Sequence, residues 1–487
     1  MAENFQLPFQ CFQFVKTKDG NSRNVLVASA GPKIYSYAAE SGQRLAVWPE
    51  DTPPAKAGSN LETEGPPEKR RKVDPSSGET TGGAPKKQAA CWSNIPILTS
   101  TPDGEYVVAL TAEDKCIRVF QITGNGSFQQ LSARVMPKRA CAITFTNKND
   151  ILCGDKFGDV YSLPLIPSAE PRISKASSQV RQGAGATPLT VHTQRNLKSL
   201  EMQIRQRSNK QVVDEPTFAH ELLLGHVSLL TDVAFVSLPS RDPSSSRKRT
   251  YILSADRDEH IRVSRGPPQA HVIENYCLGH TSFISKLCVP EWAPEYLISG
   301  GGDPFLFVWN WTQGQILHKI PLVEQTPDAK DIAVSGIWAL PSSIQARVIL
   351  VALEGRAELL CFTLEANGSL TAQEPIKVSG NVLNLQTVEG SGAVLVSVDT
   401  IHEPGSTQEW RSHSPSPSAL LEAFRPKPGA EKVEWESVTD TMVRTINSTG
   451  TSTISVDAGE KEKKELNNSL YSWENLRKKQ YGDADDE

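Results

Sequence analysis

Two stretches of this chain decide the fold, because both follow one template. The clearer copy begins at Gly279-His280 and, after an apolar run, continues as Ser299-Gly-Gly-Gly-Asp303-Pro-Phe-Leu-Phe-Val-Trp309. The other begins at Gly225-His226 and ends as Ser254-Ala-Asp-Arg-Asp258-Glu-His-Ile-Arg-Val-Ser264. Each copy therefore joins a Gly-His pair to a Ser- and Asp-containing turn and then to a short apolar strand.

A template of this kind that returns after roughly 45–55 residues is typical of a WD-repeat β-propeller blade. Each blade is a four-stranded antiparallel sheet, and the blades pack around a central channel. Weaker β-rich segments precede and follow the two clear copies, so the 487 residues predict an all-β, seven-bladed propeller with insertions. The N-terminal strand near residues 11–15 is expected to complete the seventh blade, because shared strands remove open sheet edges.

The histidines and acids of the template are expected to form a structural network. Asp303 can accept a hydrogen bond from His280, and Ser299 and the indole N–H of Trp309 can extend the chain of bonds. His226 and Asp258 hold the corresponding places in the other copy. A catalytic His–Asp dyad is the alternative interpretation of the same residues.

Composition excludes several classes of protein. The net charge of −5 gives the whole chain no basic excess that would drive binding to nucleic acid. The eight cysteines form no Cys-x-x-Cys pair, so zinc-site spacing is absent. No apolar run approaches 18 residues and the N-terminus lacks a leader pattern, so we expect neither secretion, nor a membrane span, nor a membrane partner.

The propeller is predicted over residues 1–50 and 91–425. Residues 51–90 are rich in Pro, Gly, Ser and charge, and we expect a disordered insertion. A second insertion, 166–217, is basic and is either a flexible arm that touches phosphates or a plain linker. Residues 426–487 form a charged tail that we expect to be partly helical or disordered.

A basic cluster lies inside the first insertion. Lys69, Arg70, Arg71 and Lys72 follow two prolines, as in nuclear import signals. The cluster predicts a nuclear protein, and a solvated loop is the alternative.

Motifs of catalysis are missing from the sequence. It contains no phosphate-binding loop, no Gly-x-Ser-x-Gly elbow and no His-Glu-x-x-His, and its nine histidines show no ligand spacing. We therefore expect no catalytic residue, metal, cofactor or small-molecule substrate in this chain.

Four segments are more specific than a generic blade: residues 154–162 (Gly-Asp-Lys-Phe-Gly-Asp-Val-Tyr-Ser), 222–235 with 254–264, 277–285 and 307–311. Together they closely resemble the WD-repeat non-catalytic subunit of the fungal tRNA (guanine-N7-)-methyltransferase, over roughly residues 140–320. The resemblance implies a heterodimer in which this chain binds and stabilises a Rossmann-type catalytic subunit. That subunit would use S-adenosylmethionine to form 7-methylguanosine in the variable loop of tRNA, with tRNA bound in the complex.

The resemblance also implies a docking site. In the segment 256–262, Ile261 is expected to face the blade interior, and strand alternation then places Arg262 on the opposite face. Arg262 is therefore expected to pair with a carboxylate of the catalytic subunit, with Arg257 and Lys156 as further candidates.

Two other functions remain open from the sequence. One is a generic nuclear WD-repeat adaptor in ubiquitin ligation or chromatin assembly, without a role on tRNA. The other is a propeller enzyme with an active site in its channel, which requires inward-facing acids or histidines clustered at one mouth.

Overall fold

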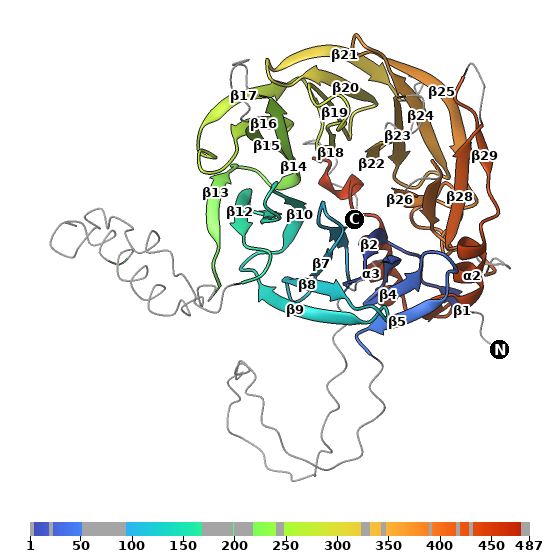
Figure 1. Ribbon diagram of the computed structural model, residues 1–487. Helices are drawn as coiled ribbons and strands as arrows, with labels where there is room; N and C mark the ends of the chain where they lie inside the picture. Colours follow the sequence, from blue (N-terminus) through green and yellow to red (C-terminus); the bar gives the residue numbers. More distant parts are fainter. Residues whose placement is uncertain are drawn as a thin grey trace.

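The computed structural model describes residues 4–18, 23–50, 94–167, 198, 218–239, 248–322, 332–341, 347–388, 392–414, 419–427 and 432–478. Within these ranges the chain forms seven four-stranded antiparallel sheets that are arranged as a ring (Figure 1). The predicted seven-bladed β-propeller is therefore confirmed.

The first four blades follow the order of the chain, each starting with its innermost strand (Figure 1). Blade one contains β2 (Cys11–Lys16), β3 (Asn24–Ala30), β4 (Lys33–Ala38) and β5 (Arg44–Trp48). Blade two contains β6 (Ile97–Ser100), β7 (Tyr106–Thr111), β8 (Cys116–Ile122) and β9 (Phe128–Val135). Blade three contains β10 (Ala140–Phe145), β11 (Ile151–Asp155), β12 (Asp159–Leu163) and β13 (Glu221–Gly225). Blade four contains β14 (Leu230–Pro239), β15 (Lys248–Asp256), β16 (His260–Arg265) and β17 (Ile273–Leu278).

The last three blades repeat this order. Blade five contains β18 (Ile284–Cys288), β19 (Tyr296–Gly301), β20 (Phe305–Asn310) and β21 (Gln315–Pro321). Blade six contains β22 (Val334–Ala339), β23 (Val348–Leu353), β24 (Glu358–Leu364) and β25 (Leu370–Lys377). Blade seven contains β26 (Val382–Thr387), β27 (Val394–Val398), β28 (Leu421–Pro426) and β29 (Trp435–Ser437).

The core lies between blades. Second strands such as β23 are buried along their whole length, because a neighbouring blade covers each face of the sheet. Apolar clusters accordingly join residues of adjacent blades, as Ile298 and Val308 of blade five join Ile349 and Val351 of blade six. Outer strands such as β21 contain only half-buried and exposed positions. Burial on both faces explains why the central strands read as continuous apolar runs.

The ring closes differently from the expectation. β2 pairs with β3 and begins its own blade, so the prediction that the N-terminal strand completes blade seven is wrong. Blade seven obtains its fourth strand from β29, which pairs with β28. The boundary expected at residue 425 therefore falls inside blade seven, because residues 432–437 carry a strand too short to stand out in the sequence.

The first described strand and the tail meet outside the blades. β1 (Asn4–Gln6) pairs with β30 (Thr453–Ser455), and Leu7 N–H donates to Ser452 C=O over 2.8 Å. Phe5, Met442, Ile446 and Leu466 share one apolar cluster with residues of blades one and seven. Packing of both termini across this junction closes the ring without a shared blade strand.

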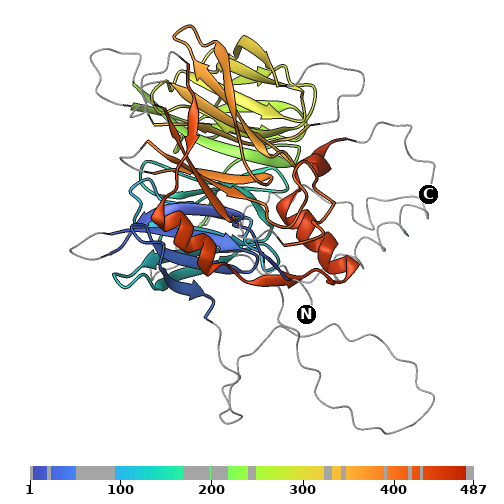
Figure 2. The same cartoon turned by 90° about the vertical axis from the view of Figure 1, so that its right-hand side faces the viewer.

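The tail is partly helical, as expected. It forms α2 (Thr441–Thr449), α3 (Glu460–Leu470) and the 3₁₀ turn η1 (Glu474–Leu476). Both α-helices pack beside the propeller, and the red C-terminal segment lies over the middle of the ring (Figures 1 and 2). None of the helices in the described part of the chain is long and apolar enough to cross a membrane.

Candidate partner-docking face

The expected network of blade five is present. His280 Nδ1 lies 2.7 Å from Asp303 Oδ2, and His280 Nε2 lies 2.7 Å from Ser299 Oγ. The indole N–H of Trp309 donates to the same Ser299 hydroxyl over 2.8 Å. Burial alone would raise the pKa of Asp303, but hydrogen bonds from His280 and Thr281 outweigh it and hold that pKa below its usual value. The network therefore ties the turn to the sheet through an ionised, fully bonded carboxylate.

Blade four builds its network with a different acid. His226 Nδ1 lies 3.0 Å from Asp256 Oδ2, and His226 Nε2 lies 2.7 Å from Ser254 Oγ. The prediction of Asp258 was wrong because the spacing of blade five was carried over. Asp256 stands two positions earlier, at the end of β15, and its Oδ1 accepts the backbone N–H groups of Asp258 and His260.

Arg262 does not face outward. It is only 9 % exposed, its Nε donates to Ser264 Oγ over 2.9 Å, and its Nη1 donates to Gly225 C=O over 3.1 Å. The expectation that strand alternation exposes Arg262 was wrong, because neighbouring blades cover both faces of β16. Burial also lowers the pKa of Arg262. This geometry fits a structural residue that bonds Ser264, which stands at the register position that Trp309 holds in blade five.

The other two docking candidates lie in turns at one end of the ring. Lys156 is exposed in the turn between β11 and β12. Arg257 is half-buried in the turn between β15 and β16, and its Nε donates to the C=O of Leu476 in the C-terminal segment over 2.6 Å. Lys156 is thus available at the surface, whereas Arg257 already binds its own chain.

Apolar and basic side chains gather around Lys156. Phe157 is 62 % exposed and carries Lys138 Nζ 4.0 Å above its ring centroid. Val227 is fully exposed, and its loop contacts the same turn, since His226 N–H donates to Gly158 C=O over 2.8 Å. Partial burial, followed by the nearby charge of Arg139, lowers the pKa of Lys156. We call Lys138, Arg139, Lys156, Phe157 and Val227 the blade-three rim.

The rim is suited to bind an acidic partner surface. Aromatic and apolar groups supply desolvated contact area at an interface, and basic groups give orientation. Gly158 has a φ of 96° and lies against the backbone carbonyls of His226 and Ser228, so a larger residue would displace the loop. The rim is therefore a fixed surface held by backbone contacts.

Among the described residues, the cavity of the central channel is lined by no histidine, aspartate or glutamate, which are the groups that an active site in the channel would require. This cavity has a volume of about 610 Å³, its walls include Arg139, Lys156 and Lys286, and its cover is formed by residues 469–476. Cys11 also lines it, and burial raises the pKa of that thiol to about 11, so it is not a thiolate nucleophile at neutral pH. The part of the chain that the structure describes contains no group of three His, Cys, Asp or Glu that could hold a metal.

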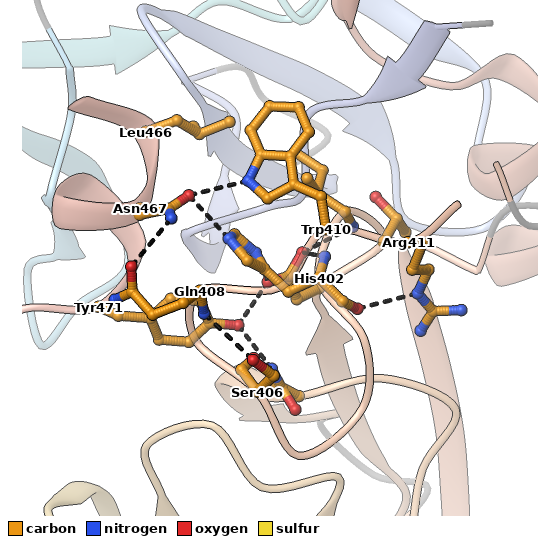
Figure 3. Close-up of polar contacts among 12 residues, drawn as sticks. His402, Ser406, Gln408, Trp410, Arg411, Leu466, Asn467 and Tyr471 are labelled. Atoms are coloured by element: carbon orange, nitrogen blue, oxygen red, sulfur yellow. Dashed lines mark hydrogen bonds and ion pairs between the residues drawn. The ribbon is translucent and has the colours of Figure 1, made fainter. Parts of the chain in front are cut away.

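Sequence reasoning missed a third histidine network, in blade seven (Figure 3). His402 Nδ1 lies 2.6 Å from Asp399 Oδ2, and its Nε2 lies 2.8 Å from Asn467 Oδ1, which also accepts the indole N–H of Trp410 over 3.0 Å. Asn467 belongs to α3, so the tail supplies the group that a blade serine supplies elsewhere. The pair Asp399-x-x-His402 was the only local signal, because no Gly-His pair precedes this turn.

Comparison with known proteins defines the class first. The chain covers 99 % of the solved RRP9 WD40 repeats with a TM-score of 0.51 at 13 % identity, and 90 % of this chain is matched, which supports a WD40 propeller fold. Residues 26–424 match the family described as tRNA methyltransferase TRM82 WD40 domain.

The particular family follows from near-full-length relatives. The protein named tRNA (guanine-N(7)-)-methyltransferase non-catalytic subunit trm82 from Aspergillus clavatus is 54 % identical, with 99 % of this chain and 100 % of the relative covered. Its namesake from Aspergillus oryzae is 52 % identical with 100 % of both chains covered, and that from Sclerotinia sclerotiorum is 36 % identical with 86 % and 90 % covered. The chain belongs to this family of non-catalytic methyltransferase subunits.

The basic cluster Lys69, Arg70, Arg71 and Lys72 lies outside the described residues, as do nearly all residues of the predicted arm 166–217. The nuclear signal and the phosphate-binding arm remain predictions.

Proposed function

We propose that this chain is the non-catalytic subunit of a two-subunit tRNA methyltransferase that forms 7-methylguanosine in tRNA. The observation that carries the proposal is the 52–54 % identity over almost the whole length to relatives that bear this name. The same identity disfavours the generic adaptor, because the match extends through the termini and not only through a blade. The partner would bind S-adenosylmethionine and perform methyl transfer, and this chain would bind the partner and stabilise its fold.

The blade-three rim is the surface that we propose for the catalytic subunit. It is exposed, basic and apolar, whereas Arg262 is buried and Arg257 is bound to Leu476. Lys156 therefore takes the role that the sequence assigned first to Arg262. Two cationic groups close together, Lys156 and Arg139, favour an acidic segment of the partner.

Purification of the tagged chain from its native cells tests this function. A stoichiometric methyltransferase and 7-methylguanosine formation on tRNA are expected in the eluate. Lys156→Glu should weaken the complex about tenfold or more, because it places like charge against an acidic partner. The matched control is Lys377→Glu, on the exposed edge of blade six, which should leave the complex intact. An eluate without methyltransferase would sink the function, and an active complex that tolerates Lys156→Glu would move the docking site elsewhere.

We also propose that tRNA is bound jointly by the two subunits and that the chain acts in the nucleus through its cluster 69–72. Replacing all four basic residues by alanine should shift a fluorescent fusion toward the cytoplasm. Unchanged nuclear fluorescence would remove the import assignment without touching the enzymatic one.

A further inference from the structure

The last described residues of the chain, 471–478, cross the mouth of the channel from blade seven to blade four. We call this segment the strap. At its start, the Tyr471 hydroxyl donates to Asp399 and accepts Asn381 Nδ2–H over 3.0 Å. At its end, Lys478 Nζ lies 3.2 Å from both Asp258 and Glu259. Only the short turn η1 is regular, so contacts with the propeller determine its course.

Blade six binds the backbone of the strap. The N–H groups of Trp473 and Glu474 donate to the two carboxylate oxygens of Glu354, each over 3.0 Å. Burial raises the pKa of Glu354, although these hydrogen bonds oppose the shift. Lys286 Nζ lies 4.4 Å from the centroid of the Trp473 ring, and both residues line the cavity of the channel. One carboxylate thus fixes the turn, and an aromatic ring covers a channel cation.

Blades five and six bind one arginine of the strap. Arg477 Nη1 donates to Gly302 C=O over 3.1 Å and lies 3.4 Å from Ser282 Oγ, and Nη2 donates to Ile332 C=O over 2.9 Å. The guanidinium also lies 5.6 Å from the centroid of the Phe283 ring. Two carbonyls at fixed positions and an aromatic face match a planar fork of donors, which lysine does not have.

We infer that the channel mouth is a peptide-binding site that reads an aromatic residue followed four positions later by arginine, and that this chain fills it with its own strap. The groups that contact the peptide belong to blades five and six, either in strand β18 or in the residues next to their strands: Lys286, Glu354, Gly302, Ile332 and Phe283. The strap is the end of the described chain and contributes no blade strand, so it can leave without opening a sheet. The site therefore binds an exchangeable segment, supplied here by the chain itself.

The test removes the strap together with α3 after the complete chain has folded. A protease site is inserted at Gly459, which is exposed and has no atom near the position of a Cβ. The chain is then cut, the fragment that carries α3 and the strap is removed, and binding of a labelled synthetic peptide of residues 460–478, which restores both, is measured. Binding is expected, with a loss of about 10- to 100-fold for Arg477→Ala and a clear loss for Arg477→Lys, because the charged fork is what the site reads.

A peptide of the same composition in scrambled order is the control and should not bind. Equal affinity of the original and the Arg477→Ala peptides, or no saturable binding by a cut propeller that keeps its far-ultraviolet spectrum, overturns the proposal.

A second measurement covers the case in which the cut chain unfolds. In the uncut chain, Arg477→Ala should increase amide exchange of residues 473–478 about tenfold or more, while β19 and β23 exchange as before. Unchanged exchange in the strap contradicts the proposal. Neither experiment uses the catalytic subunit, so their outcome is independent of the proposed function.

Discussion

Blades four and five share a template but bond its histidine and serine with different residues. Blade five holds His280, Ser299, Asp303 and Trp309 in one network. Blade four has Ser264 at the position of Trp309, since Ser264 pairs with Ile252 as Trp309 pairs with Leu297. Arg262 then donates to Ser264, and the acid moves to Asp256. Both blades therefore keep the positions of the histidine and the serine and exchange the groups around them.

The largest loss of stability is expected when the acid that bonds the histidine, Asp303 or Asp256, is replaced. Asp303→Ala should reduce the free energy of unfolding by about 3 kcal/mol, because it leaves the buried His280 without its acceptor and also removes the acceptor of the Thr281 N–H and hydroxyl in the adjoining exposed turn. Asp256→Ala should cost about 2 kcal/mol, since its turn is slightly more open to water. Denaturant unfolding measures both. Equal and small losses would show that the networks contribute little and that inter-blade packing dominates.

The third strands provide the second contrast. Trp309→Phe should cost about 2 kcal/mol, because Trp309 is fully buried and its N–H bond to Ser299 is lost together with ring volume. Arg262→Met should cost about 1 kcal/mol, since Gly225 C=O and Ser264 lose a donor but the aliphatic stem is kept. Arg265→Met is the control: this residue of the same strand is half-buried, and its guanidinium bonds only the partly exposed side chains of Glu274 and Gln269, so the change in stability should be less than about 0.5–1 kcal/mol.

Loss of partner binding by Arg262→Met at unchanged stability would restore the docking role that the sequence suggested.

These contrasts show which parts of the molecule could be read from sequence. The blades could be, because apolar strands and the Gly-His template have fixed spacing. The role of Asp256 could not be predicted from the sequence. Asp256 and Asp258 lie two residues apart, and only the geometry of the turn decides which of them bonds the histidine. The exposure of Arg262 was predicted wrongly, because alternation along a strand gives a solvent-facing side only in a sheet that has one open face. The network at His402 depends on Asn467, which is 65 residues away in sequence and therefore invisible to spacing.

Acid should affect both blades in the same direction. The folded-state pKa values of Asp303 and Asp256 are lowered, mainly because hydrogen bonds from His280 and His226 outweigh the opposing effect of burial. Each contribution to stability is therefore complete above the unfolded pKa of about 3.9 and is lost as the pH falls through the lower folded value. Asp303→Asn should flatten the decline of stability below about pH 4, as followed by denaturant unfolding at a series of pH values. An unchanged slope would mean that other carboxyls control acid unfolding.

The smallest effect is expected at Asp258, the acid that the sequence selected. It lies 3.2 Å from Lys478 Nζ, and both side chains are about half exposed. Exposed ion pairs of this kind contribute less than about 0.5–1 kcal/mol, so Asp258→Ala should leave the free energy of unfolding almost unchanged. The same change should still loosen the end of the strap, which amide exchange at residues 476–478 measures. If Asp258→Ala instead costs as much as Asp256→Ala, then blade four uses the acid spacing of blade five in solution, and the distinction between the two networks disappears.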